Sequence, residues 1–536
     1  MTVKFNRRTT VKMMAAGAAA LVLPGFGVGR ADAAVTALKQ SIAEAASKDA
    51  SIAAFYRSRA FKPIFTGNGD GRRRGALLKS LARAGDHGLP VSRYDADGLK
   101  QMFKAAKTPT DRGQVEVEAA RRFLDYADAM RSGLLDPRKI DRSIVVDVPR
   151  YDRTATLTAF AKSSPQGFMK KLNPRKPEYV RLQKEKLRLE KLLAKGGWGE
   201  KVGAKALKPG QSGAAVVQLR NRLIRMGFMR KSASQSYDAN IQAAVQKFQI
   251  SHGLAPDGVA GAGTISEINK DVPDRLSQVL VGLERNRWLP NPLEKKHVWV
   301  NLPDFHVDIM EKGKSTFRSR VVIGKQTEDR KTPEFSDVME FMVINPSWYV
   351  PRSIVTKEYL PLLKRNRGAA GQLQIIGSNG KPVNRANINF AQYNERNFPY
   401  SMKQPPSKGN ALGLVKFMFP NKYNIYLHDT PSKSLFGREV RAFSHGCVRV
   451  HKPFEFAYAL LKAQESDPEG YFQSILRTRA ERRVELRQPL PVHLAYFTAW
   501  VDAKGRAHYR RDVYGRDGRI FAALTKAGVT LRSVKA

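Results

Sequence analysis

The sequence contains very little cysteine. Cys447 is the only one in 536 residues, so an intramolecular disulfide framework is excluded. Paired Cys-x-x-Cys and His-Glu-x-x-His spacings are also absent, which disfavours a zinc site built from His428, Asp429, His445 and Cys447. We therefore expect neither a metal nor a cofactor.

Long apolar runs are missing as well. The run from Met13 to Leu23 is far shorter than the roughly 20 residues that a spanning helix needs, which disfavours an uncleaved membrane anchor. It follows Arg7-Arg8 and precedes Ala31-Asp32-Ala33, an order typical of a cleaved export signal over residues 1–33. The paired arginines point to the twin-arginine route. We expect the mature protein in the periplasm.

Acidic residues are few relative to basic ones. The chain has 93 Lys and Arg against 48 Asp and Glu, a formal charge of +45. Removal of residues 1–33, with five basic residues and one acidic residue, leaves +41. Such a surface concentrates polyanions. Because export takes the chain away from nucleic acid, we expect peptidoglycan stem peptides or an anionic membrane surface as partners. The alternative is that the charge only keeps the protein soluble.

The hydrophobic pattern predicts a multidomain α+β protein. Residues 34–203 have helical periodicity, for example over Val117 to Leu134 and Tyr179 to Leu193. Residues 204–272 form a small unit with two short amphipathic helices. The first carries Val216, Leu219, Leu223 and Met226, and the second carries Ile241, Ala244, Val245 and Phe248. We expect a helical domain followed by a compact helical module.

Beyond Asn286 the apolar period changes to two, which predicts a mostly β domain over residues 273–485. The long polar stretch 349–410, with a short helix at Ile354 to Arg365, interrupts this pattern. A segment of that length is often a lid over a site, although a surface elaboration is the alternative. Residues 486–536 are very basic and strand-like near Val492 to Val501. We expect them to be a C-terminal extension without an assigned function.

The strongest chemical signal is the string Ser444-His445-Gly446-Cys447-Val448-Arg449. Its cysteine lies nineteen positions after His428. A cysteine near a histidine can act as a nucleophile, with the imidazole taking the thiol proton. His428 falls at the end of an expected strand, Tyr423 to Leu427, and Cys447 falls in a turn before an expected helix, Pro453 to Leu461. Asp429, or a nearby backbone carbonyl, would fix the tautomer of His428.

The turn around the cysteine offers hydrogen-bond donors for a tetrahedral oxyanion. His445 and the amides near Gly446 and Cys447 are the candidates, and Ser444 is a supporting residue. Glycine at position 446 would let the backbone approach a substrate closely. The pattern as a whole favours acyl transfer through a thioester.

The string and its upstream histidine resemble the L,D-transpeptidase family with the YkuD-type catalytic domain. His428 matches that family's general base and Cys447 its nucleophile. Further similarities include Ser132-Gly-Leu-Leu-Asp-Pro137 and Asn345-Pro-Ser-Trp-Tyr-Val-Pro-Arg-Ser-Ile354. They point to a large Gram-negative subgroup, in which a scaffold domain, a peptidoglycan-binding module and a lid accompany the catalytic sheet.

The resemblance implies a role for each part of the chain. Residues 204–272 are similar to a three-helix peptidoglycan-binding domain that takes glycan, although a spacer that binds nothing is the alternative. Arg449 occupies a position that steers the substrate carboxylate, and Tyr426 and Trp348 are further substrate-binding candidates.

The implied reaction cleaves a stem tetrapeptide after its third residue and passes the acyl group to an amine. The amine belongs to a second stem, which gives a 3-3 cross-link, or to an envelope protein. Hydrolysis of the same thioester, an L,D-carboxypeptidase reaction, is one alternative. A non-enzymatic wall-binding protein is the other.

Overall fold

The computed structural model describes residues 30–290 and 292–532. Most of the expected export signal, residues 1–29, lies outside the described residues. The first helix begins at Arg30, so the expected cleavage site at Ala31-Asp32-Ala33 falls on helical backbone. Within the described residues no helix combines the length and the apolar character needed to cross a membrane.

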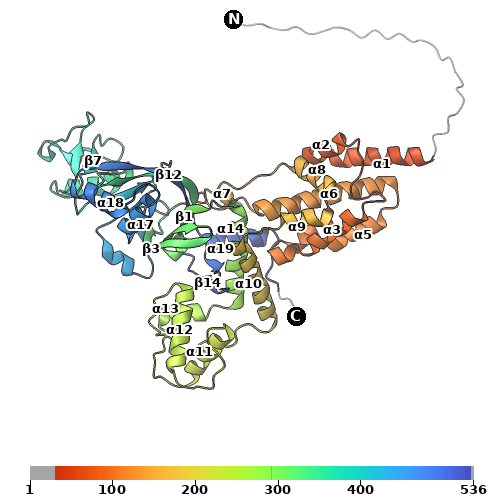
Figure 1. The fold of residues 1–536 in the computed structure, drawn as a ribbon, viewed down its shortest axis with the longest axis horizontal. Helices are drawn as coiled ribbons and strands as arrows, with labels where there is room; N and C mark the ends of the chain where they lie inside the picture. Colours follow the sequence, from red (N-terminus) through yellow and green to blue (C-terminus); the bar gives the residue numbers. More distant parts are fainter. Residues whose placement is uncertain (1–29, 291, 533–536) are drawn as a thin grey trace, which may run out of the picture.

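The N-terminal lobe is helical and packs around one long helix, α6 (Figure 1). The apolar face expected on this helix is confirmed, because Phe123, Leu124 and Met130 are all fully buried. The helix begins with a capping box in which Thr108 and Asp111 satisfy each other's backbone amides. The helices of the lobe are α1 (Arg30–Ala46), α2 (Ala50–Ser58), α3 (Gly71–Ala82), α4 (Val91–Tyr94), α5 (Ala96–Ala105), α6 (Pro109–Ser132), α8 (Arg153–Lys162) and α9 (Pro165–Leu172). The short helix α7 (Pro137–Ile140) lies outside this lobe, with Ile140 packed against the core around α14.

The second lobe is a small three-helix module at the lower end of the molecule in Figure 1. Its helices are α11 (Ala214–Arg225), α12 (Ala239–His252) and α13 (Ala262–Ile268). The apolar residues predicted on the first two helices form its core, except that Met226 is only partly buried. Gly253 ends α12 with φ of 69°, a conformation that favours glycine.

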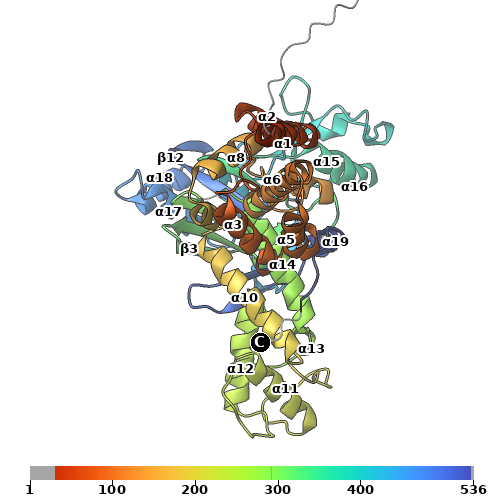
Figure 2. The ribbon, with the colours of Figure 1, turned by 90° about the vertical axis from the view of Figure 1, so that its right-hand side faces the viewer.

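Two long helices join the N-terminal lobe, the three-helix module and the β-rich lobe described below. Helix α10 (Pro177–Ala194) lies against α14 (Val272–Trp288), and Figure 2 shows both running towards the module. Their shared core also includes apolar residues from the C-terminal segment, such as Ile520 and Leu524.

The third lobe, which we name the sheet lobe, is built on a nine-stranded sheet in the order β10-β3-β11-β9-β8-β4-β12-β1-β2. Strand β2 also pairs with β3, so the sheet curls back on itself. Helices α17 (Pro453–Leu461) and α18 (Pro468–Arg477) bury their apolar faces against it. The strands are β1 (Lys296–Asn301), β2 (His306–Glu311), β3 (Lys314–Gly324), β4 (Phe335–Ile344), β8 (Val415–Met418), β9 (Leu427–His428), β10 (Ala442–Ser444), β11 (Val448–Val450) and β12 (Arg482–Ala495).

The segment 349–410 is a small structured unit with a core of its own, which includes Val355, Leu363 and Met402. It contains α15 (Arg352–Ile354), the π-helical turn η3 (Val355–Tyr359) and α16 (Leu360–Arg365), where one short helix was expected. It also contains a three-stranded sheet that the sequence did not predict. The strands are β5 (Trp348–Tyr349), β6 (Gln374–Ile376) and β7 (Ser401–Gln404).

The expected boundary at residue 485 needs correction, because it cuts through strand β12. This strand runs inside the sheet, antiparallel to β4 and parallel to β1, and therefore belongs to the sheet lobe. The chain continues into the hairpin β13 (Ala499–Val501) and β14 (Ala507–Tyr509) and helix α19 (Arg516–Lys526). Helix α19 is held to α14 by a buried ion pair between Asp517 and Arg285, 3.0 Å apart. Residues 486–532 are thus an integral part of the fold.

Candidate active site

A cavity of about 620 Å³ lies between the nine-stranded sheet and the 349–410 unit. Cys447 and His428 both line it, as do most of the other expected site residues: Ser444, His445, Arg449, Tyr426 and Trp348. Gly446 and Asp429 are the two expected residues that do not line the cavity. The fold therefore brings together side chains from β5, β9, β10 and β11.

The nucleophile candidate sits in a tight turn between β10 and β11. Gly446 has φ of 121°, a conformation that an L side chain rarely adopts. Ser444 Oγ donates to the Cys447 carbonyl at 2.5 Å and accepts from the Gly446 amide at 3.1 Å. Thr332 Oγ1, which lies outside the turn in the sequence, donates a hydrogen bond to the Gly446 carbonyl at 2.7 Å. Because the Gly446 amide and the His445 Nε2 both have partners, the Cys447 amide is the candidate oxyanion donor that remains.

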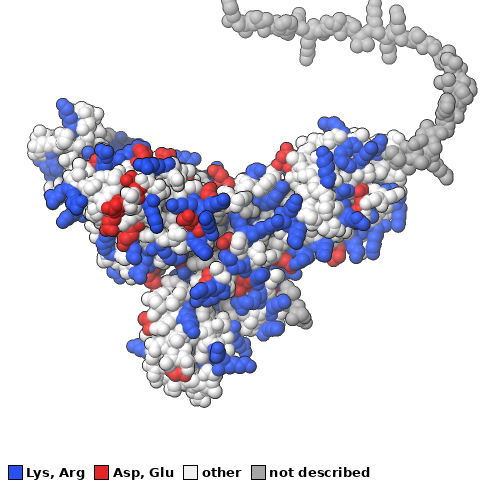
Figure 3. Space-filling model, in the orientation of Figure 1, with Lys and Arg blue, Asp and Glu red and all other residues white. Residues whose placement is uncertain are grey.

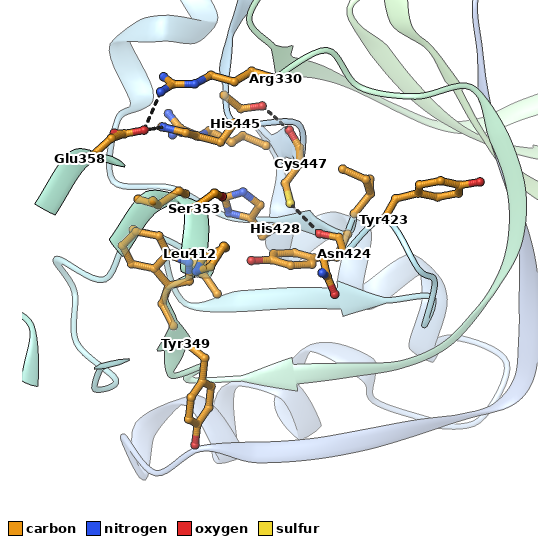
Figure 4. A pocket seen from close by; sticks show the side chains of 18 of the residues that line it. Arg330, Tyr349, Ser353, Glu358, Leu412, Tyr423, Asn424, His428, His445 and Cys447 are labelled. Atoms are coloured by element: carbon orange, nitrogen blue, oxygen red, sulfur yellow. Dashed lines mark hydrogen bonds and ion pairs between the residues drawn. The ribbon is translucent and has the colours of Figure 1, made fainter. Parts of the chain in front are cut away.

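The Cys447 thiol is partly buried and donates to the Asn424 carbonyl at 3.4 Å (Figure 4). This carbonyl is available because the strand expected over Tyr423 to Leu427 is shorter than predicted. The Asn421 side chain accepts from the amides of Tyr423 and Ile425, which bends the chain into a turn. Burial raises the pKa of the Cys447 thiol to about 11. The resting sulfur is therefore protonated at neutral pH.

His428 is buried and held in one orientation. Its Nδ1 donates to the Asp429 carbonyl at 2.5 Å, which leaves Nε2 as the proton acceptor. Burial, followed by the charge of Arg449, lowers the pKa of His428 to about 3, so the imidazole is neutral at rest. Of the two alternatives for fixing the tautomer, the backbone carbonyl is the one observed.

The hydrogen bonds of the Asp429 carboxylate go to groups other than the His428 ring. The carboxylate accepts from Lys433 Nζ at 2.5 Å and from the Leu414 amide at 2.9 Å. These contacts tie the end of β9 to neighbouring loops. Asp429 therefore supports the backbone whose carbonyl orients the imidazole.

Arg449 brings a cation to the cavity. It pairs in register with His428 across β11 and β9, and no carboxylate within the described ranges forms an ion pair with it. Its Nε is buried without a hydrogen-bond partner, which is costly for a charged group. A substrate carboxylate would supply the missing partner. Tyr426 also lines the cavity. The centre of the Tyr426 ring is 5.6 Å from the centre of the His428 ring.

Glu358 is the site residue that the sequence did not indicate. It comes from the π-helical turn of the 349–410 unit and accepts from His445 Nε2 at 2.7 Å and from Arg330 at 2.6 Å (Figure 4). Glu358 and His445 are 87 positions apart, so no local pattern could have shown their contact. The pair links the 349–410 unit directly to the turn that carries Cys447.

No group of three or more His, Cys, Asp or Glu residues in the described part of the chain could hold a metal ion. His428 and Cys447 instead have partners of their own in backbone carbonyls. A thiol and a neutral imidazole at one cavity are the groups that acyl transfer requires.

Three family models match separate parts of the chain. Residues 50–185 match one described as "Scaffold domain", residues 212–268 match "Putative peptidoglycan binding domain", and residues 295–468 match "L,D-transpeptidase catalytic domain". The chain therefore carries a YkuD-type L,D-transpeptidase catalytic domain together with scaffold and peptidoglycan-binding domains. These matches confirm the family resemblance and the multidomain fold predicted from the sequence.

Two individual proteins are similar to parts of the chain. A protein of Haemophilus influenzae named "Putative L,D-transpeptidase" is 33% identical over 225 residues, which are 42% of this chain and 45% of that protein. The chain thus spans about half the length of this curated relative. A crystal structure of an L,D-transpeptidase from Xylanimonas cellulosilytica is 15% identical and covers 55% of this chain and 100% of its own, with a TM-score of 0.17. A score that low carries no argument.

Proposed function

We propose that this protein is a peptidoglycan L,D-transpeptidase that works through a cysteine acyl-enzyme. The observation that carries the proposal is the placement of Cys447 and His428 on one cavity, with His428 Nδ1 bound to a backbone carbonyl. That arrangement leaves Nε2 as the base for the thiol. The domain matches support peptidoglycan as the class of substrate and the cell envelope as the site of action.

The reaction begins with a stem tetrapeptide in the cavity. As the Cys447 sulfur attacks the carbonyl carbon of the third residue, its proton passes to His428 Nε2. The Cys447 amide stabilises the oxyanion, and Arg449 pairs with the substrate carboxylate. The C–N bond then breaks, and the terminal D-Ala leaves with the proton from His428. The product is a thioester on Cys447.

Transfer completes the cycle when an acceptor amine attacks the thioester. His428 takes a proton from the amine and returns it to the departing sulfur. The acceptor is the side-chain amine of a second stem, which gives a 3-3 cross-link, or an amine of an envelope protein. Residues of the 349–410 unit, among them Glu358 and Tyr359, form one wall of the cavity. We infer that this wall restricts water during the reaction and so favours transfer over hydrolysis.

Product analysis separates transfer from hydrolysis. Purified protein is incubated with a defined tetrapeptide stem, and the products are analysed by mass spectrometry. Transfer yields cross-linked dimer, and the Cys447→Ala variant yields none. Tripeptide without dimer would make the protein an L,D-carboxypeptidase. No product from either protein would favour a non-enzymatic wall-binding role.

We propose that the protein acts in the periplasm, because the sequence predicts an export signal over residues 1–33. Removal of residues 1–33 on passage to the periplasm would bring the basic surface of Figure 3 to the wall and to anionic membrane lipid. Fractionation of cells with an antibody against the mature chain tests this. Full-length protein retained in the cytoplasm would contradict it.

A further inference from the structure

A second cavity, of about 390 Å³, is lined by residues of the three-helix module and residues of the nine-stranded sheet lobe. Its walls come from residues 253–256 after α12, from β3, from residues 436–441 before β10, and from residues 510–513. We name this cavity the seam groove. It shares no lining residue with the cavity that holds Cys447.

The seam groove is lined by more positive than negative charge. Five arginines face two carboxylates, Asp304 and Glu439. Asp304 is already paired with Arg510 at 2.6 Å and with Arg318 at 2.5 Å, and Glu439 is paired with Arg511 at 2.8 Å. Both carboxylates therefore already have arginine partners, and Arg510 and Arg511 are two of the five arginines that line the groove.

Three arginines of the groove, Arg320, Arg438 and Arg441, have no carboxylate partner among the described residues. Arg441 lies over the Phe305 ring and donates to the Arg438 carbonyl at 2.8 Å, so part of its role is structural. Burial and the nearby charge of Arg320 lower the pKa of Arg441 to about 10. Cations held this close repel one another, and a bound anion would relieve that repulsion.

The position of the groove connects it to the proposed chemistry. Arg441 directly precedes β10, and β10 ends at Ser444, three residues before Cys447. Six residues of extended chain span at most about 20 Å. On its other side the groove is walled by residues 253–256 of the module that matches a peptidoglycan-binding model. The groove therefore lies between that module and the nucleophile.

We propose that the seam groove binds the free carboxylates of a peptidoglycan stem peptide, distinct from the stem that occupies the Cys447 cavity. Arg320 and Arg438, both exposed, form charge-assisted hydrogen bonds with these carboxylates. Leu254, Pro256 and Phe436 give the groove apolar walls that suit peptide side chains. The inference rests on the proposed function, because peptidoglycan supplies the carboxylate-bearing peptide.

Hydrogen exchange reports on the two cavities separately. Full-length Cys447→Ala protein is titrated with a soluble disaccharide tetrapeptide that has free carboxylates. Slower exchange at residues 353–359 reports on the Cys447 cavity, and slower exchange at 436–441 reports on the groove. The Arg320→Gln/Arg438→Gln variant should need at least about ten times more fragment to protect 436–441. The control is Arg57→Gln/Arg72→Gln, which removes the same charge from exposed scaffold positions and should match the parent.

Four results would overturn the inference. The first is protection at 353–359 without protection at 436–441, which would leave the proposed function standing. The second is equal protection of 436–441 by a fragment with amidated carboxylates. The third is an equal loss of affinity in the Arg57→Gln/Arg72→Gln control. The fourth is stronger protection of 436–441 by phosphatidylglycerol vesicles or by inorganic phosphate, which would assign the groove to phosphate groups.

Discussion

At the scale of single residues, the site is an uncharged pair at rest. Burial raises the pKa of the Cys447 thiol to about 11 and lowers that of His428 to about 3. A thiolate and an imidazolium are therefore not preformed, and the proton must move as the sulfur attacks. This arrangement protects a lone thiol from oxidation between reaction cycles, because the thiolate is the reactive form.

The first prediction concerns the pH dependence of the thiol. Because only the thiolate reacts with iodoacetamide, and the folded pKa lies above that of free cysteine, the alkylation rate of Cys447 should rise about tenfold per pH unit from pH 6 to pH 9. Intact mass against time gives the rate, with free cysteine as the reference. A rate that is constant between pH 5 and pH 8 would show a preformed ion pair and contradict this account.

The second prediction concerns the base. Replacing His428 by Ala removes the acceptor for the thiol proton, so acylation of Cys447 by a stem tetrapeptide should slow by about 100-fold to 10,000-fold. His451→Ala is the matched control, because His451 is exposed and does not line the cavity. Stopped reactions analysed by intact mass give both rates. Equal rates for His428→Ala and the control would remove His428 from the proposed role.

At the scale of elements, the contact between η3 and the β10–β11 turn connects the 349–410 unit to the nucleophile. Glu358 is its centre, because it pairs with both Arg330 and His445. About a third of the Glu358 side chain is exposed, so the contact is worth at most about 1 kcal/mol. A free energy of this size can shift the equilibrium between a closed and an open cavity, but it is too small to keep the cavity closed permanently.

The third prediction tests this contact. Glu358→Gln removes the charge that attracts Arg330 while keeping the side chain's shape, so residues 352–365 should exchange amide hydrogens up to about fivefold faster. The proportion of hydrolysed to transferred product should rise as water enters more often. Glu395→Gln is the control, because Glu395 is an exposed acidic residue of the same unit. Unchanged exchange in Glu358→Gln would mean that the pair does not hold the unit closed.

At the scale of the whole molecule, the C-terminal segment joins the lobes together. Strand β12 supplies a strand inside the catalytic sheet, and α19 contributes to the core around α10 and α14. Arg285 lies between Glu334 and Asp517 in a buried network that connects α14, β4 and α19. The relative positions of scaffold, module and sheet therefore depend on the last part of the chain.

The fourth prediction follows from that dependence. A chain ending at residue 485 should fail to form the catalytic sheet, because β4 and β1 would lose the strand between them.

A milder change, Leu494→Ala, should destabilise the fold by about 2 to 5 kcal/mol, since Leu494 is 2% exposed. Arg487→Ala, on an exposed position of the same strand, is the control for thermal unfolding. A stable, cooperatively folding chain of residues 34–485 would contradict the assignment.

Local pattern in the sequence predicted much of this structure. The helix Pro453 to Leu461 and the buried face of α6 follow from apolar spacing alone, and the Ser-His-Gly-Cys string indicated the turn that carries the thiol. Contacts between distant segments were not predictable. Glu358 reaches His445 only through the tertiary fold, and the Asn424 carbonyl reaches the thiol only because Asn421 shortens β9. The place of β12 in the sheet depends on pairing across more than a hundred residues.

The most direct test is the mass of the protein during turnover with a stem tetrapeptide. Rapid acid quenching should trap an adduct equal to the tripeptide acyl group on Cys447, with D-Ala released in equal amount, and the Cys447→Ala variant should carry none. If the wild-type protein converts the tetrapeptide and no adduct forms on Cys447, the covalent mechanism proposed for this site is wrong.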